Sequence, residues 1–225
     1  MRHHQLLVSM LLFAACTGSP THQNQTLNQD SLIAAEQRIA DSMAAENARQ
    51  KALNDLSMSA YGGSKFGMST EEVLQTEGFS GGTLTGEIIR PPANKRRVGN
   101  YNYDIEARFH ENKLYLVTFG SAWQTAAFIE FDMVTLLNNL KDVIAIRYGE
   151  PNQRYKMPNV MDFEPGAHRW VYKWEIEDKV ITIGMRESVA GANYQAIMWI
   201  YNKPIFDNIG YNKANVNKVM DAAKF

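Results

Sequence analysis

The stretch YNYDIEARFHENKLYLVTFG, residues 101–120, has the pattern of an antiparallel β-hairpin. Apolar and polar residues alternate in its first half, where the apolar positions are Tyr101, Tyr103, Ile105, Ala107 and Phe109. Because successive side chains of a strand point to opposite faces, this spacing places the apolar residues on one face of a sheet. Glu111-Asn112 is a two-residue turn, and residues 114–120 supply the returning strand. The apolar face of such a hairpin needs a second layer to cover it.

A long helix is predicted directly after the hairpin, from Thr125 to Tyr148. Its apolar residues recur at helical spacing and form a broad stripe: Phe128, Phe131, Leu137, Leu140, Val143, Ile144 and Ile146. The helix ends at Gly149-Glu150-Pro151, a sequence that cannot continue it. We expect this helix to cover the sheet.

A second antiparallel set of strands follows a loop at residues 157–167. The first strand alternates, with large apolar residues at Trp170, Tyr172, Trp174 and Ile176. Glu177-Asp178 forms the turn, residues 180–185 return, and residues 194–201 close the set. The alternation predicts that Trp170 shares one face of the sheet with the next two aromatic residues.

A similar order of elements is predicted upstream of the hairpin. Tyr61-Gly62-Gly63-Ser64 marks a break in regular structure. Ser69 and Glu72 then form a capping box, which opens a short helix that we expect to stop at Gly78 as its C-cap. Residues 83–90 are predicted as the first strand.

The predicted fold class is α+β. The folded domain is expected over residues 61–203, as two αβββ halves (61–124 and 125–203) whose antiparallel strands pack against helices. Residues 204–225 are predicted as a C-terminal tail with a short helix after Lys213.

Two further segments precede this domain. Residues 30–58 are rich in strong helix formers and are predicted as one helix. Its apolar stripe, through Leu32, Ile39 and Met43, is thin, which favours a spacer helix over a helix that docks on a partner. Residues 16–29 are polar and predicted to be a disordered tether.

The first residues predict export. Residues 6–15 form an apolar run of ten residues, whereas a membrane-spanning helix needs about 20. The run is therefore the core of a signal peptide over residues 1–15. Ala14 and Ala15 precede Cys16, which is the only cysteine of the chain.

Small residues followed by Cys16 resemble the lipobox of bacterial lipoproteins. The resemblance implies cleavage before Cys16 and attachment there of a diacylglyceryl group and a further acyl chain such as palmitate. It implies a membrane anchor as well. Because Thr17 rather than aspartate follows, it implies the outer membrane, with the domain on the periplasmic or the outer side.

A second resemblance lies in residues 66–74, which are similar to the helix opening of small envelope lipoproteins, including the assembly factor BamE. The two αβββ halves also resemble, in architecture alone, the β-lactamase inhibitor protein. The resemblance of residues 66–74 implies a non-enzymatic protein-binding or scaffold module that acts on another envelope protein, whereas the resemblance to the β-lactamase inhibitor protein concerns the fold alone.

Composition and motifs argue against several other functions. The formal net charge of -1 does not predict binding to nucleic acid. A single cysteine excludes a cysteine cluster for zinc, and no phosphate-binding loop, zinc-protease or serine-nucleophile motif occurs. We therefore expect no catalytic residue, no cofactor and no metal site. A less favoured alternative is an enzyme built around His168 with Asp162 and Glu164.

Two groups of residues are candidate binding surfaces. Lys95, Arg96 and Arg97 form a basic loop able to meet lipid phosphates, although a solvated loop is the commoner interpretation. Trp170, Trp174 and Trp199 are candidates for an exposed platform that binds a glycan or another small ligand, although residues at this spacing more often belong to a sheet core. Ligand binding through sheet aromatics is thus the main alternative to a scaffold.

Overall fold

The computed structural model describes residues 22–209, with side chains from Ser31 onward except those of Lys95, Phe128 and Glu130. The chain divides into two units, and most of helix α1 (His22–Met58) belongs to the first, which ends at Arg49. The second unit begins at Gln50 and holds every strand described. None of the helices in residues 22–209 is long and apolar enough to span a membrane.

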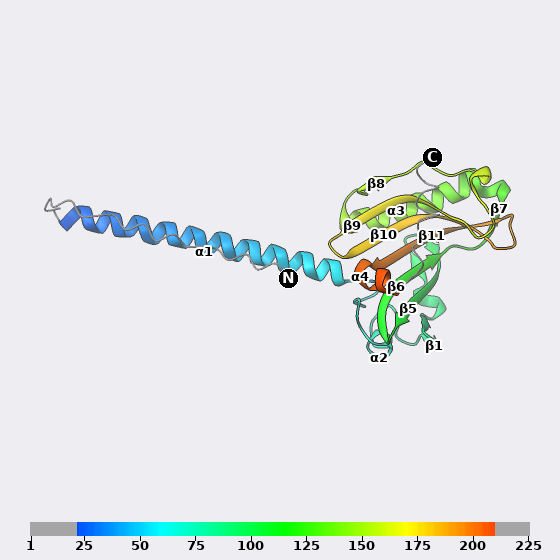
Figure 1. Ribbon diagram of the computed structural model, residues 1–225, viewed down its shortest axis with the longest axis horizontal. Helices are drawn as coiled ribbons and strands as arrows, with labels where there is room; N and C mark the ends of the chain where they lie inside the picture. Colours follow the sequence, from blue (N-terminus) through cyan, green and yellow to red (C-terminus); the bar gives the residue numbers. More distant parts are fainter. Residues whose placement is uncertain (1–21, 210–225) are drawn as a thin grey trace. The chain divides into compact units, whose positions relative to one another are not determined.

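One antiparallel sheet organises the second unit and confirms the predicted α+β class (Figure 1). The strand order is β1-β2-β5-β6-β11-β10-β9-β8, and β7 pairs with β11. The bounds are Thr83–Thr85 (β1), Ile88–Arg90 (β2), Asp104–His110 (β5), Lys113–Gly120 (β6), Gln124–Thr125 (β7), Gln153–Arg154 (β8), His168–Ile176 (β9), Lys179–Glu187 (β10) and Asn193–Asn202 (β11). A separate small hairpin comprises Arg97–Val98 (β3) and Tyr101–Asn102 (β4), after the 3-10 turn Ala93–Lys95.

The hairpin at the centre of the sequence forms as its alternation predicts. Buried residues alternate with less buried ones along β5. His110 pairs with Lys113 across the turn, where Glu111 and Asn112 have φ angles of 49° and 56°. Positive φ at both turn positions is the geometry of a type I′ turn, whose twist matches that of the flanking strands. The Asn112 side chain also accepts hydrogen bonds of 3.0 and 2.9 Å from the backbone nitrogen and the hydroxyl of Thr70.

The pairing of β6 with β11 joins the two halves into one sheet, with Phe119 opposite Met198. The first half departs from the predicted αβββ pattern. Residues 83–90 are not one strand but the hairpin β1–β2, which reverses at Gly86 with a φ of 59°. Glycine adopts this left-handed conformation at little cost, so the chain turns where a continuous strand was expected.

The capping box at the start of α2 (Thr70–Leu74) is confirmed. The Ser69 hydroxyl accepts a 3.3 Å hydrogen bond from the Glu72 nitrogen, and the Glu72 carboxylate accepts a 2.8 Å bond from the Ser69 nitrogen. The predicted stop at Gly78 is wrong, because the helix is capped at Gln75. Gly78 instead lies against Gly62, where a Cβ on Gly78 would stand 2.6 Å from the Gly62 Cα.

The long helix covers the apolar face of the sheet, as expected (Figure 1). A 3-10 turn (Ala126–Phe128) and a π-helical turn (Ile129–Met133) precede α3 (Val134–Tyr148). Its buried residues, with Met133 before them, are Leu136, Leu137, Leu140 and Ile144. The predicted stripe is wrong at Phe131 and Ile146, which are 79% and 88% exposed. A π-helical turn shifts the phase of the residues within it, and Ile146 lies two positions past the buried Ile144, on the opposite side of the helix.

Both ends of the predicted domain differ from the structure. Residues 22–29, predicted as part of a disordered tether over 16–29, belong to α1, because nothing after Pro20 prevents a polar segment from extending the helix. Residues 204–208, expected at the start of the tail, belong to α4 (Lys203–Asn208), whose Phe206 is buried. The predicted signal peptide, Cys16 and the helix expected after Lys213 lie outside the described residues.

Candidate ligand-binding site

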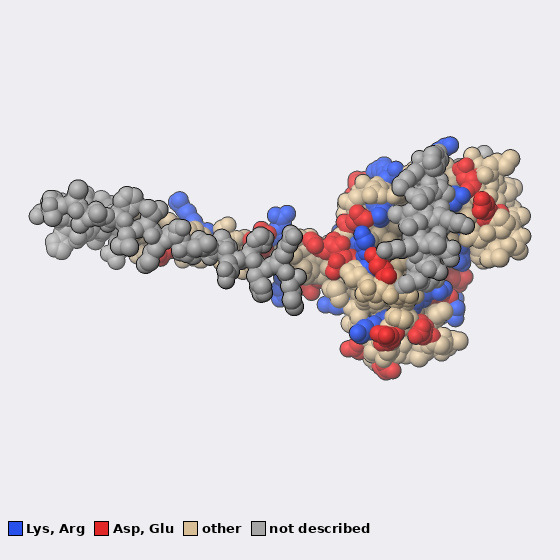
Figure 2. Space-filling view, in the orientation of Figure 1, with Lys and Arg blue, Asp and Glu red and all other residues tan. Residues whose placement is uncertain are grey.

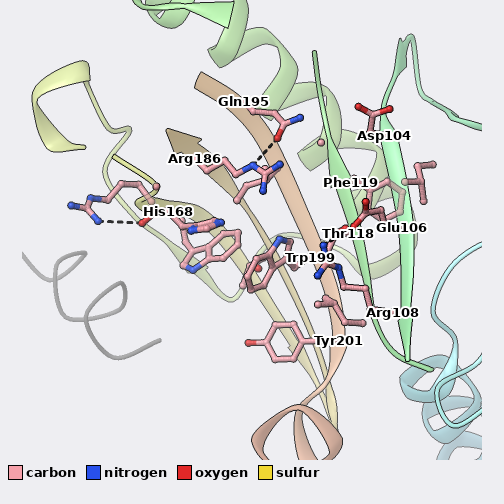
Figure 3. Close-up of a pocket in the computed structure, with 18 of the residues that line it drawn as sticks. Asp104, Glu106, Arg108, Thr118, Phe119, His168, Arg186, Gln195, Trp199 and Tyr201 are labelled. Carbon is pink, nitrogen blue, oxygen red and sulfur yellow. Dashed lines mark hydrogen bonds and ion pairs between the residues drawn. The ribbon is translucent and has the colours of Figure 1, made fainter. Parts of the chain in front are cut away.

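The face of the sheet turned away from α3 lines a cavity with a volume of about 1100 Å³. Its floor is formed by side chains that alternate with the core residues of the central strands, among them Glu106, Thr118, Thr182, Arg186, Gln195 and Trp199. Residues 164–167, in the loop before β9, and Phe206 of α4 complete the lining. Figure 3 shows side chains from β5, β6, β9, β10 and β11 directed into the same space.

An aromatic cluster forms one side of the cavity. The ring centroids of Trp170 and Trp199 lie 5.1 Å apart, with their planes at 67°. The His168 ring lies 6.0 Å from Trp170 and 5.3 Å from Trp199. Phe206 extends the cluster, 6.4 Å from Trp199 and 4.6 Å from Tyr201. Such rings offer a ligand a large apolar surface at little cost in side-chain entropy.

A β-bulge turns Trp170 toward this cavity. The register of β10 against β9 shifts between Ile183 and Gly184, so that Ile183 pairs with Tyr172 and Gly184 with Trp170. Without the extra residue, alternation would place Trp170 on the same face as Tyr172. Gly184 allows the two strands to approach, because a Cβ there would lie 2.1 Å from the carbonyl oxygen of Arg169.

Charged side chains form the other side of the cavity. Glu106 accepts hydrogen bonds from Arg90 at 2.5 Å and from Arg108 at 2.6 Å. Burial alone would raise the pKa of Glu106, but the hydrogen bonds and positive charges of the two arginines outweigh it and lower the pKa. Arg96 lies near them and pairs with Asp104 at 3.3 Å.

Arg186 is bound differently from these arginines. Its Nε donates a 2.7 Å hydrogen bond to the side-chain oxygen of Gln195, and its guanidinium carbon lies 5.0 Å from the centre of the Trp123 ring (Figure 3). Burial lowers the pKa of Arg186; Glu106 acts against this effect, and the like charge of Arg108 adds to it. The guanidinium is thus positioned by a neutral side chain and an aromatic ring.

Three polar atoms around the cavity are buried without a hydrogen-bond partner in the described part of the chain. They are Arg108 Nε, His168 Nε2 and Thr182 Oγ1. Burial, and then the charge of Arg186, lower the pKa of His168 to about 4, so its imidazole is neutral at pH 7. Buried polar atoms are nearly always paired in native proteins, and the described residues supply no partner for these three.

The structure brings together only part of the predicted surface. Arg96, Trp170 and Trp199 line the cavity. Trp174 does not, because it lies in the core at 1% exposure and donates a 2.9 Å hydrogen bond to the carbonyl oxygen of Gly149. Arg97 is exposed, bonds to the carbonyl oxygen of Gly99 and is not among the lining residues, while the Lys95 side chain and Cys16 fall outside the described residues.

Three charged residues of the site, Glu106, Arg108 and Arg186, are not predicted by the sequence patterns. Glu106 and Arg108 occupy the polar positions of the alternating strand, where they read as solvent-facing. Arg186 continues the same face of β10 as Thr182. Local alternation carries no signal that separates these positions from solvent-facing ones, because an antiparallel sheet commonly leaves its second face to water.

The residues of the enzyme alternative are not gathered around one centre. Glu164 and His168 both line the cavity. Asp162 does not; its carboxylate accepts a 2.8 Å hydrogen bond from the backbone nitrogen of Asn159 and caps the 3-10 turn Val160–Asp162. Within residues 22–209, no three histidine, cysteine or acidic side chains are grouped so as to hold a metal ion.

No protein-family model, curated protein or solved structure matches this chain. Positive and negative side chains are interspersed on the face of the second unit that Figure 2 shows, in keeping with the near-zero net charge.

Proposed function

We propose that this protein binds a small amphipathic molecule in the cavity on the open face of its sheet. The observation that carries the proposal is the lining itself, in which an aromatic cluster around Trp199 faces charged and unpaired polar atoms around Arg108. Ligand pockets typically enclose roughly 300–1,000 Å³ and combine mainly apolar walls with a few polar groups. The cavity of about 1100 Å³ lies just above that range.

We propose binding rather than catalysis as the role of this site. A nucleophilic mechanism requires a hydroxyl or thiol hydrogen-bonded to a general base. The buried hydroxyl of Thr182 has no hydrogen-bond partner among the described residues.

We further propose that the protein carries out this function at a membrane. The lipobox-like sequence before Cys16 supports a lipid-anchored lipoprotein of the outer membrane. In that setting the cavity belongs to a domain held near a membrane surface by its anchor.

A matched pair of variants tests ligand binding. The probe is N-phenyl-1-naphthylamine, a neutral dye whose emission rises in an apolar site. We expect saturable binding at one site per chain, weakened about tenfold by Trp199→Ala, since truncating a central aromatic residue of a binding site costs about 1–2 kcal/mol or more. Phe131→Ala is the control, because Phe131 is exposed outside the cavity. Equal affinity in both variants, or no saturable binding, contradicts the proposal.

A scaffold that binds another envelope protein is the second candidate. Helix α1 favours it, because Leu32, Ile39 and Met43 lie along one side of the helix and each is about 60% exposed. Affinity capture from solubilised envelopes, with the double variant Ile39→Lys and Met43→Lys as the comparison, tests this function. A stoichiometric partner that the double variant loses supports it, and recovery of the bait alone contradicts it.

A further inference from the structure

The charges of the cavity do not balance. Five arginines but three carboxylates are among its lining residues. Three of the guanidinium groups, those of Arg90, Arg108 and Arg186, stand around the carboxylate of Glu106. Glu106 divides its two oxygens between Arg90 and Arg108. Among the described residues, no carboxylate forms an ion pair with Arg186. This end of the cavity therefore carries an excess of positive charge.

Arg186 is held in place although it lacks a counter-ion. Its partner Gln195 stands directly opposite it in the β10–β11 ladder and is 2% exposed. The amide nitrogen of Gln195 donates a 2.5 Å hydrogen bond to the carbonyl oxygen of Ser121, which fixes the amide and directs its oxygen to Arg186. Only Nε of the guanidinium takes part in this bond, so the two terminal nitrogens remain for another acceptor.

Arg108 presents a second incompletely used guanidinium. One terminal nitrogen bonds to Glu106, while Nε is buried without a partner in the described part of the protein. Beside these arginines, burial first and then the like charge of Arg186 lower the pKa of His168. A neutral His168 adds no charge of its own and can donate one hydrogen bond.

The apolar end of the same cavity begins at Trp199. Its ring lies between the Trp170 ring and Phe206, with centroid distances of 5.1 and 6.4 Å. Figure 3 shows Trp199 and Arg186 directed into one space, with Arg108 facing them from β5. One molecule can therefore reach both the aromatic rings and the free guanidinium atoms.

We propose that the cavity selects an anionic amphiphile, whose apolar body packs on Trp199 and whose oxyanion is bound by Arg186 together with Arg108. The inference rests on the proposed function and adds the charge of the ligand. Guanidinium groups bind carboxylate, sulfonate and phosphate oxygens through paired N–H donors, and these bonds are stronger than those between neutral groups. A neutral ligand of the same shape would leave the excess positive charge without a counter-ion.

Two dyes with one skeleton test the charge preference in the full chain. 1-Anilinonaphthalene-8-sulfonate carries a sulfonate on the rings of N-phenyl-1-naphthylamine, which is neutral. We expect the anionic dye to bind about tenfold more tightly, since a charged hydrogen bond contributes about 1.5–3 kcal/mol. Raising the salt concentration should weaken the binding of the anionic dye and leave the binding of the neutral dye unchanged. This comparison uses the wild-type protein alone. Equal affinity for both dyes overturns the inference.

Variants of Arg186 locate the effect. Arg186→Met removes the charge and keeps an unbranched apolar side chain, so it should remove the preference for the anionic dye over the neutral dye. Arg186→Lys keeps the charge but not the paired N–H donors, so it should retain part of the preference. It serves as the second measurement if Arg186→Met folds poorly. Arg97→Met is the control, an exposed arginine outside the cavity, and should change neither dye. An unchanged preference in Arg186→Met and Arg186→Lys contradicts the inference.

Displacement of the neutral dye identifies the chemical group. Dodecanoate and dodecyl phosphate should both displace it at lower concentration than dodecanol. The ligand is a carboxylate if dodecanoate is the stronger competitor, and a phosphate if dodecyl phosphate is. If dodecanol competes equally, anion selection fails while the proposed ligand binding stands. If neither dye binds saturably, both proposals fail together.

Discussion

The ammonium group of Lys179 donates a 2.6 Å hydrogen bond to the carbonyl oxygen of Leu56, in the last turn of α1. It also bonds to the carbonyl oxygen of Ser59 at 2.8 Å and to the hydroxyl of Tyr148 at 2.8 Å. Lys179 is 0% exposed and lies at the start of β10. One cation thus satisfies the carbonyl groups at which a helix ends and links them to the sheet of the same unit.

Replacing Lys179 should destabilise the second unit. Lys179→Met removes the donor and leaves the Leu56 and Ser59 carbonyl oxygens without it, so we expect a loss of about 2–3 kcal/mol in the free energy of unfolding. Urea unfolding followed by circular dichroism measures this loss. Lys65→Met is the control, because Lys65 is exposed on the surface. A loss no larger than that of the control would show that these bonds contribute little.

The same residue should make stability rise with pH above neutrality. Burial first, and then the charge of Arg147, lower the pKa of Lys179 to about 7, below the 10.5 of an unfolded lysine. Between these values the unfolded chain binds more protons, so the free energy of unfolding increases with pH. Measurements are confined to pH 7 to 9.5, because above this range Tyr103 and Tyr201, whose pKa values are raised by burial, also contribute to the pH dependence of stability. The slope should be smaller in Lys179→Met, and equal slopes would contradict this assignment.

Acid should destabilise the protein through His168. Its pKa of about 4 in the folded chain lies below the unfolded value of 6.5, because burial and Arg186 disfavour the imidazolium. The unfolded chain binds the extra proton first, so stability is lost as the pH falls from 6.5 through 4, by up to about 3 kcal/mol. Thermal melts of the wild type and of His168→Phe across this range measure the effect. Parallel curves for the two proteins would exclude His168 as its source.

A side chain at Gly184 should disturb the bulge that directs Trp170. In Gly184→Ala the new Cβ would stand 2.1 Å from the carbonyl oxygen of Arg169, so β9 must move. We expect a loss of about 2–3 kcal/mol and a red shift of tryptophan emission as Trp170 leaves its packed position. Gly86→Ala is the comparison: its φ of 59° costs about 1–2 kcal/mol, but its Cβ meets open space and should leave the emission unchanged.

Cys16→Ser tests the lipid anchor. If Cys16 is acylated, the serine variant should leave the membrane fraction or stay unprocessed, because the hydroxyl of serine does not replace the thiol in lipid attachment. Fractionation of cell envelopes and the mass of the mature chain measure both. A serine variant that matures normally and still fractionates with membranes would disprove the anchor.

Local sequence patterns predicted much of the fold. The turn at Glu111-Asn112, the capping box at Ser69, and the long helix ending at Gly149 all form, because they depend on residues within one turn or on strict alternation. The errors lie where a distant contact overrides the local pattern. Gly78 is needed for its approach to Gly62 rather than for a cap.

By itself, the sequence determined the fold class and the elements around the central hairpin, and it offered Trp170, Trp174 and Trp199 together as one candidate platform. The tertiary structure decided which residues come together on the sheet face that lines the cavity. Trp170 faces the cavity and Trp174 the core only because β9 gains a bulge against Gly184. Strand pairing then brings Arg108, Arg186 and Trp199 together from strands far apart in sequence, and register between distant strands leaves no trace in local periodicity.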